Sequence, residues 1–419
     1  MVFSIEKIVR PKILTLEPYR CARDDFQEGI LLDANENTYG PTIQGLSEEE
    51  EKLDLNRYPD PHQILLKKQI CAYRNSEAQK PESVIKLPTD EKGAPIKLSP
   101  VNLCLGVGSD ESIDSIIRAC VKPGKEKVLL CPPTYGMYGI CCTVNDAEIV
   151  EVPLNLENFQ IQPDKIIEQI KADSSIKLIY ITSPGNPTAT LIKQDLILDV
   201  LSEIEKLSWD GFLIVDEAYV DFAPVGSSIC SLVNKHPNLV VMQTFSKAFG
   251  LAGIRLGICY STPSLSVLLN AMKYPYNVNN ITSSMALRAT KKESLMNMKK
   301  TAAVIIDQRA IVLEKILKIR GVGRNRGGLD SNFILIEILN KDGVPDNKIA
   351  HEAYSKLATD RQVVVRFRGN ELGCKGCLRI TIGTPEENKK LLEQFEDVLS
   401  HALEAVSYTH LTLPTILLV

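Results

Sequence analysis

The chain has 419 residues, is 44% hydrophobic and 24% charged, and carries a formal net charge of -4. This length predicts two joined domains with enough interior to bury a cofactor. The mild acidity gives no signal for nucleic acid or an anionic membrane, and the composition excludes a disordered chain. No apolar run approaches the roughly 20 residues of a membrane helix. Residues 1–12 lack the pattern of a secretory or transit signal, so we expect a cytoplasmic enzyme.

Short apolar runs alternate with helix-length amphipathic stretches from about residue 127 onward. The runs at 127–131, 176–182, 211–215 and 239–243 are typical of buried strands, and 163–172 and 193–206 of helices between them. This alternation predicts an α/β fold whose mainly parallel sheet lies between helices. Ligands of such sheets bind at the carboxyl ends of the strands. Polar residues that follow these runs are therefore the candidate site residues.

The second half of the chain predicts a smaller α+β domain. Its pattern consists of a long helix at 292–319, strands at 332–338, 363–367 and 378–382, and a terminal helix from 386 to about 405. We expect an N-terminal arm and part of the small domain at 1–54, a large domain at 55–290 and the small domain at 291–405. Residues 74–100 are expected to form an exposed insertion. Residues 406–419 have no relation to the preceding helix and are interpreted as an artefactual tail; a native tail that docks on the body is the alternative.

Eleven cysteines are scattered through apolar segments, which favours reduced core residues over a disulfide framework. Cys374 and Cys377 have the spacing of a redox or metal pair. However, no second pair matches them and the five histidines show no ligand spacing, so an ordinary loop is the favoured interpretation. We predict no metal site.

Asp216 and Lys247 are the candidate reactive residues. Asp216 follows the run 212–215, where its carboxylate could pair with a protonated pyridine nitrogen or, alternatively, ligate Mg²⁺. Lys247 lies in the stretch 244–250 after the next strand, and apolar and cationic neighbours would lower its pKa and make its amine nucleophilic. A lone Ser-Lys pair is usually a solvated loop, but the preceding strand, the glycines and Arg255 favour a site. Thr244, Ser246 and Arg255 could donate hydrogen bonds to a phosphate.

Three further segments are ambiguous by themselves. Gly106 to Ser112 precedes a helix predicted at 113–121, where an anion could bind, although Ser109 or Asp110 could merely cap the helix. Tyr135 follows a rigid proline turn that could hold its ring flat over a cofactor, and Asn186 lies in another proline turn. Both segments could equally be ordinary turns.

Together these segments resemble the fold-type-I pyridoxal-phosphate aminotransferases, and more narrowly the histidinol-phosphate aminotransferases. The resemblance extends from Val9 to about His401. Its most specific stretches are Leu16-Glu17-Pro18-Tyr19, Leu32-Asp33-Ala34-Asn35-Glu36-Asn37, Arg57-Tyr58-Pro59-Asp60-Pro61, Arg366-Phe367-Arg368-Gly369 and Cys377-Leu378-Arg379-Ile380-Thr381.

The resemblance implies a role for each matching residue. Lys247 would carry the cofactor as a Schiff base, Asp216 would pair with the pyridine nitrogen, Asn186 and Tyr219 would bind the ring 3-oxygen, and Tyr135 would stack on the ring. The cofactor phosphate would be held by Ser109, Asp110, Thr244, Ser246, Arg255 and, from a second subunit, Tyr58. Substrate would be bound by Tyr19, Asn35, Tyr276, Arg366 and Arg379. A homodimer with shared active sites is therefore implied.

The implied reaction is amino transfer between L-histidinol phosphate and 2-oxoglutarate in histidine biosynthesis. The alternatives are a decarboxylase of a phosphorylated amino acid and a non-enzymatic cofactor-binding regulator. The chain departs from the family at Ala189, where glycine is usual. If this position has a positive φ, alanine would cost on the order of 1 kcal/mol; in a helical conformation it would be harmless.

Overall fold

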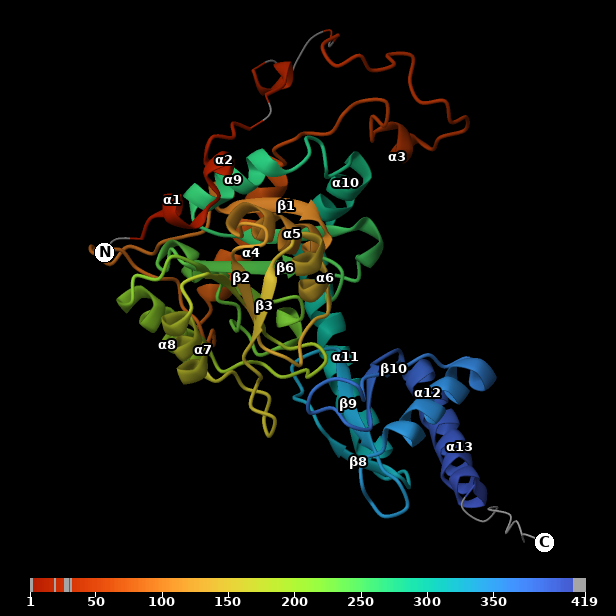
Figure 1. The fold of residues 1–419 in the computed structure, drawn as a ribbon. Helices are drawn as coiled ribbons and strands as arrows, with labels where there is room; N and C mark the ends of the chain where they lie inside the picture. The colour runs from red at the N-terminus through yellow and green to blue at the C-terminus, as the bar shows by residue number, and fades with distance from the viewer. Residues whose placement is uncertain (1–2, 19, 26–29, 31, 410–419) are drawn as a thin grey trace, which may run out of the picture.

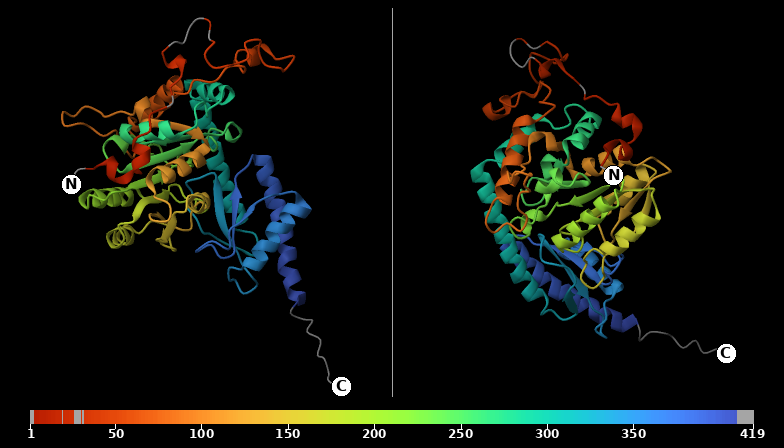
Figure 2. Two further views of the ribbon diagram at one scale, coloured as in Figure 1. Left: turned by 45° about the horizontal axis from the view of Figure 1, so that its top comes forward. Right: turned by 90° about the vertical axis from the view of Figure 1, so that its left-hand side faces the viewer.

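The computed structural model describes residues 3–18, 20–25, 30 and 32–409. It consists of a large α/β domain and a small α+β domain, which the long helix α11 (Lys292–Ile316) connects (Figure 1). The predicted fold class is confirmed. Figure 2 shows the small domain as a separate lobe at one end of the molecule, while the N-terminal arm projects from the opposite end.

The large domain is built on a seven-stranded sheet in the order β1-β7-β6-β5-β4-β2-β3. Only β7 runs antiparallel to its neighbours. The strands are β1 (Leu103–Val107), β2 (Lys127–Leu130), β3 (Glu148–Glu151), β4 (Ile176–Thr182), β5 (Phe212–Asp216), β6 (Leu239–Thr244) and β7 (Leu256–Tyr260). Every residue of β5, β6 and β7 is buried, because helices cover both faces of the sheet.

Alternate residues of the central strands face two different cores. Leu213 and Val215 pack with α4 (Ile64–Ala78), α7 (Pro163–Ala172) and α8 (Gln194–Lys206). Phe212 and Ile214 pack on the opposite face with α5 (Gly108–Cys120), α6 (Met137–Val144) and α9 (Pro263–Met272). The period of two in a strand therefore fixes which side chains remain at the strand ends for a site.

The small domain is a four-stranded antiparallel sheet with helices packed against it. Its strands are β8 (Val322–Asn325), β9 (Phe333–Ile338), β10 (Arg366–Phe367) and β11 (Cys377–Thr381), in the order β10-β11-β9-β8. Its core combines β9 and β11 with α11, α12 (Asn347–Arg361) and α13 (Pro385–Thr409). The sequence pattern missed α12, whose buried face contains two alanines, and α13 extends four residues beyond the predicted end. Residues 410–419 of the suspected tail lie outside the described residues.

The N-terminal arm contains the short helices α1 (Ile5–Ile8), α2 (Pro11–Leu14) and α3 (Glu48–Glu51). Its first part packs on the large domain: Ile8 and Val9 join the core of α5, and the Arg10 amide donates to the Ala119 carbonyl at 2.8 Å. The prediction that the arm belongs in part to the small domain is therefore wrong for these residues. Beyond them, residues 32–56 extend past α10 (Asn280–Ala289), at the end of the molecule remote from the small domain (Figure 1).

The exposed insertion predicted at 74–100 is wrong in its first residues. Residues 74–78 complete α4, and Arg74 is only 6% exposed. A charged residue with weak periodicity around it looked solvated, but its guanidinium pairs with Asp221 in the interior. Residues 90–95 are exposed, as expected.

All eleven cysteines are free. Among the described residues, no group of three metal-ligating side chains comes together, and no helix is long and apolar enough to cross a membrane.

Ala189 has a φ of 53°, the left-handed conformation that is unfavourable for alanine. Its methyl group packs with Tyr219 and Phe333. We expect Ala189→Gly to change the free energy of unfolding by less than about 1 kcal/mol, because relief of the left-handed backbone offsets the lost burial of one methyl group.

Urea denaturation of the two proteins measures this difference. The matched control is Ala302→Gly, in the same cluster but inside α11, which should be destabilised by about 1 kcal/mol or more because nothing offsets its loss. Equal losses in both variants would contradict the offset at Ala189.

Candidate active site

The candidate site is a cavity of about 260 Å³ at the carboxyl ends of the large-domain strands. Both domains contribute to its walls. It is lined by Ser109, Asp110, Tyr135, Thr182, Asn186, Asp216, Ala218, Tyr219, Thr244, Ser246, Lys247, Ala252, Arg255, Arg368 and Arg379. The structure therefore brings together eleven of the sixteen predicted site residues, which span positions 109 to 379 of the chain.

Lys247 lies three residues after the end of β6, with its Nζ atom 5.5 Å from the centre of the Tyr219 ring. Solvent reaches the side chain through the cavity. Even so, the surrounding protein atoms disfavour the charged amine, and this desolvation, together with the positive charges of Arg379 and Arg255, lowers the pKa of Lys247. A larger fraction of the amine is then neutral, which is the form that attacks a carbonyl carbon.

Asp216 is the last residue of β5 and is fully enclosed by protein. The Tyr138 hydroxyl donates to its Oδ2 atom at 2.7 Å, and the Ala218 amide donates to Oδ1 at 3.1 Å. Burial raises the pKa of Asp216 to about 6 despite these two donors. A cation placed against this carboxylate would stabilise its charged form, so the site suits a positively charged partner. Sequence reasoning did not single out Tyr138.

A cluster of hydrogen-bond donors surrounds the start of α5. The Thr244 and Ser246 hydroxyls lie 2.9 Å apart, and Arg255 Nη1 lies 3.4 Å from the Ser246 hydroxyl. The carboxylate of Asp110 is not one of these donors. It accepts hydrogen bonds from Tyr135 at 3.2 Å and from Arg255 at 3.4 Å. Asp110 can contribute its backbone N–H, as can Ser109, at a helix start that favours negative charge.

Two glycines permit this close approach of α5 and Arg255. A Cβ atom on Gly108, whose φ is 72°, would lie 2.5 Å from Arg255 Nη2. A Cβ on Gly257 would lie 2.3 Å from the Gly108 carbonyl. Arg255 itself has a φ of 53°, a left-handed conformation that turns its guanidinium back toward the helix start. The donors and the backbone are therefore arranged for a phosphate-sized anion.

The arginines of the small domain close the cavity. Arg379 on β11 donates to the Asn186 side-chain oxygen at 2.5 Å, which links the two domains. Burial and the neighbouring charges of Arg368 and Arg366 lower the pKa of Arg379. Arg366 is the cross-strand partner of Arg379 but is exposed and does not line the cavity. Arg368 does line it, and it pairs with Glu371 at 2.8 Å.

Sequence reasoning thus missed Arg368 as a site residue. Arg368 stands in the matched stretch Arg366-Phe367-Arg368-Gly369, but the resemblance assigned a role only to Arg366. The cluster has three guanidinium groups against the single carboxylate of Glu371, so its excess positive charge suits a phosphate or dicarboxylate ligand.

Three predicted site residues lie away from the cavity in this chain. Tyr58 and Tyr276 stack on each other with their ring centres 4.6 Å apart, and Tyr58 is 52% exposed. Asn35 is exposed on the arm. Tyr19 lies outside the described residues.

Gly257→Ala is expected to reduce the free energy of unfolding by about 1–3 kcal/mol, because the added methyl group must push the start of α5 away. Gly253→Ala provides a matched control, since a Cβ there meets nothing within 4 Å and should change stability by less than about 0.5 kcal/mol. Urea denaturation compares them, and equal stability of both variants would show that the close approach is not a constraint.

The chain matches a known protein family and is similar to curated relatives along most of its length. The family model "Aminotransferase class I and II" matches residues 27–395. The histidinol-phosphate aminotransferase of Candida maltosa is 57% identical over 399 residues, which cover 95% of this chain and 99% of that protein. That of Saccharomyces cerevisiae is 52% identical over 403 residues, covering 95% and 98%.

Solved structures show the same architecture. The histidinol-phosphate aminotransferase of Sinorhizobium meliloti in complex with pyridoxal-5'-phosphate has a TM-score of 0.70 at 22% identity, covering 88% of this chain and 90% of that chain. That of Clostridium acetobutylicum has a TM-score of 0.68 at 22% identity, covering 87% and 99%. At this identity the match shows the fold alone. The family match and the curated relatives establish that the chain belongs to the class I and II aminotransferases and, within them, to the histidinol-phosphate aminotransferase family.

Proposed function

We propose that the protein transfers an amino group between L-histidinol phosphate and 2-oxoglutarate, in histidine biosynthesis, with pyridoxal phosphate as its cofactor. The observation that carries this proposal is one cavity that joins a lysine of lowered pKa, a buried carboxylate and a cluster of arginines. The names of the curated relatives support the substrate.

The residues fit the cofactor. The buried Asp216 would pair with its pyridine nitrogen, and Tyr135 would lie against its ring. Ser109, Thr244, Ser246 and Arg255, with the backbone at the start of α5, would hold its phosphate. Asn186 and Tyr219 would bind its ring hydroxyl. Gly108 and Gly257 support this assignment, because a larger residue at either position would collide with the phosphate-binding groups.

Pyridoxal phosphate, when bound, supplies an aldehyde that captures amines and a ring that accepts the electron pair released at the substrate α-carbon. Lys247 would hold the cofactor through its side-chain nitrogen before substrate arrives. Once released, its neutral amine would remove the proton from the substrate α-carbon. It would then deliver this proton to the carbon atom that carries the aldehyde in the free cofactor. Asp216 would keep the pyridine nitrogen protonated, and Tyr138 would keep the Asp216 carboxylate in place.

The arginine cluster would recognise the substrate. Arg379 and Arg366 are the residues proposed from the family resemblance, and Arg368 is added because it lines the cavity. Guanidinium groups bind phosphate and carboxylate in bidentate fashion, so one cluster can receive the phosphate of histidinol phosphate and the carboxylates of 2-oxoglutarate in turn. Tyr19, Asn35 and Tyr276 would complete this end of the site.

We also propose a homodimer with shared active sites. Tyr58 and Asn35 lie away from the cavity of their own chain, so they are available to that of a second copy. An apolar groove of about 370 Å³ between α4 and α9, with Ile64, Val101 and Val267 among its lining residues, adds an exposed face that a second copy would bury.

The substrate proposal predicts that the protein with cofactor transfers the amino group of L-histidinol phosphate to 2-oxoglutarate. Histidinol, which lacks the phosphate, should react with a kcat/KM lower by about a hundredfold or more, because it leaves the half-buried guanidinium groups of Arg368 and Arg379 without their anionic partner. A coupled glutamate assay measures both reactions. Release of CO₂ from a phosphorylated amino acid without amino transfer would contradict the proposal.

The shared sites predict that two inactive variants complement each other. Lys247→Ala and Tyr58→Ala, refolded together, should recover roughly a quarter of the wild-type activity, because half of the dimers are mixed and each mixed dimer has one intact site. Lys247→Ala mixed with Asp216→Ala is the control. It should recover nothing, because both residues belong to the same chain's cavity. Absence of recovery in the first mixture would contradict shared sites.

A further inference from the structure

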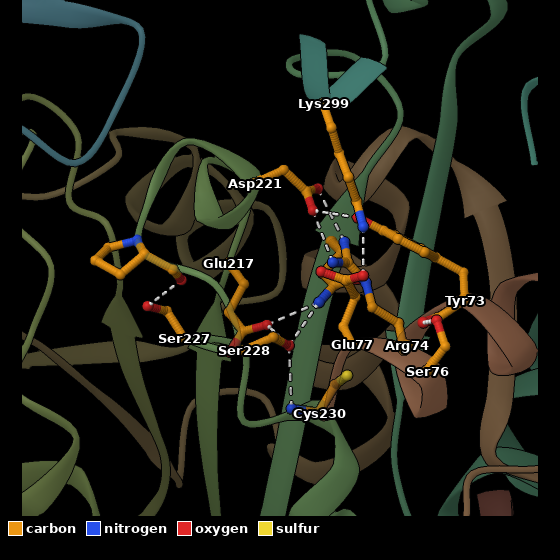
Figure 3. Close-up of polar contacts among 12 residues, drawn as sticks. Tyr73, Arg74, Ser76, Glu77, Glu217, Asp221, Ser227, Ser228, Cys230 and Lys299 are labelled. Atoms are coloured by element: carbon orange, nitrogen blue, oxygen red, sulfur yellow. Dashed lines mark hydrogen bonds and ion pairs between the residues drawn. The ribbon is translucent and has the colours of Figure 1, made fainter. Parts of the chain in front are cut away.

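The segment from Asp216 to Asp221 has two functional faces. Asp216 and Tyr219 line the candidate active site. Glu217 and Asp221 do not line this site; they make hydrogen bonds within a buried cluster of polar side chains that includes Arg74 (Figure 3). Asp221 belongs to the short helix η3 (Val220–Phe222), so the cluster contacts the segment near both of its ends.

Glu217 is held by three donors. The Ser228 hydroxyl lies 2.5 Å and the Gln243 side-chain nitrogen 2.7 Å from its Oε2 atom, and the Ile229 amide lies 2.7 Å from Oε1. Glu217 is 3% exposed, so water does not compete for these bonds. These bonds hold the side chain of the residue that follows Asp216 in the sequence.

Gln243 continues the chain of bonds. This residue of β6 is 1% exposed. While its nitrogen donates to Glu217, its side-chain oxygen accepts from Arg74 Nε at 2.8 Å and from the Tyr260 hydroxyl at 3.0 Å. The Gln243 nitrogen thus faces an acceptor and its oxygen faces two donors, so the amide makes all of these hydrogen bonds in one orientation only.

Arg74 connects Gln243 to Asp221. Its two Nη atoms bind the Asp221 carboxylate in bidentate fashion, at 2.7 and 2.9 Å. The Tyr73 hydroxyl adds a third bond to the same carboxylate at 3.0 Å. Although burial opposes it, the charge of Arg74 keeps the pKa of Asp221 below its ordinary value. Side chains from α4 and β6 thus bridge Glu217 and Asp221, the two anchors of the segment.

We infer that Arg74 and Gln243 are positioning residues of the active site: together they clamp the back of the segment 216–221 and so fix Asp216 and Tyr219 toward the cofactor. Neither Arg74 nor Gln243 lines the cavity. The effect of this clamp is transmitted by the backbone between two anchored residues, and a rigid support of this kind sets how well the groups on the other face are oriented. This inference rests on the proposed function of the cavity.

The test measures cofactor binding by the full-length apoprotein. The dissociation constant of pyridoxal phosphate is obtained by fluorescence titration, the orientation of the bound ring by its visible circular dichroism band, and stability by the melting temperature of the apoprotein. Arg74→Met and Gln243→Met should each raise the dissociation constant by about tenfold or more, since each loses buried hydrogen bonds that orient the segment. Both should also weaken the dichroism band.

Two further variants separate positioning from stability. Arg74→Met/Asp221→Asn removes both charges of the buried pair, so its melting temperature should recover toward wild type while cofactor binding remains weak. Arg309→Met is the matched control, because Arg309 is similarly buried, at 7% exposed against 6% for Arg74, and donates to the Ser331 carbonyl instead. It should change cofactor affinity by less than about twofold.

The inference would be overturned if Arg74→Met and Gln243→Met bound pyridoxal phosphate as tightly as the wild type. It would also be overturned if Arg74→Met/Asp221→Asn recovered cofactor affinity together with melting temperature. If the wild-type apoprotein itself does not bind pyridoxal phosphate, the proposed function fails and the inference with it. If the wild type binds pyridoxal phosphate and the variants bind it equally well, the positioning role of Arg74 and Gln243 is rejected while the proposed function stands.

Discussion

The burial of the Asp216 carboxylate at the end of β5 is the constraint on which the active site depends. A carboxylate without water is unfavourable, and the two donors that it receives do not compensate, since the pKa of Asp216 remains raised to about 6. The folded protein therefore carries an electrostatic cost that a cation in the cavity relieves. Under the proposed function, the protonated pyridine ring of the cofactor would be that cation.

The position of β5 within the sheet explains how the buried Asp216 carboxylate is held in place. β5 lies in the middle of seven strands, so its end cannot move without disturbing both cores. Lys247 follows the neighbouring strand β6 and faces the same cavity. The arginines reach it from the other domain, which Arg379 ties to Asn186. The proposed reactive groups thus stand on the large domain, while the arginines proposed to bind substrate stand on the small domain.

The residues that follow strands could be predicted from the sequence, because a buried apolar run locates the strand and the next polar residue must lie at its end. Asp216 and Lys247 were found in this way. Arg368 stands beside Arg366 in a stretch that resembles the family, but only the structure shows that Arg368 lines the cavity and Arg366 does not. Arg74 and Gln243 could not, since their pairing depends on how α4 packs against β6, and neither periodicity nor composition specifies that contact. Substrate identity came from resemblance alone.

Under the proposed function, Lys247 carries the cofactor. Reduction of the cofactor-loaded protein with borohydride, followed by proteolysis and mass spectrometry of the peptides, tests it most directly, because reduction makes the link between lysine and pyridoxal phosphate permanent. We predict one stoichiometric adduct, on Lys247, and its loss when histidinol phosphate is added before reduction. An adduct on another lysine, or none, would contradict the account.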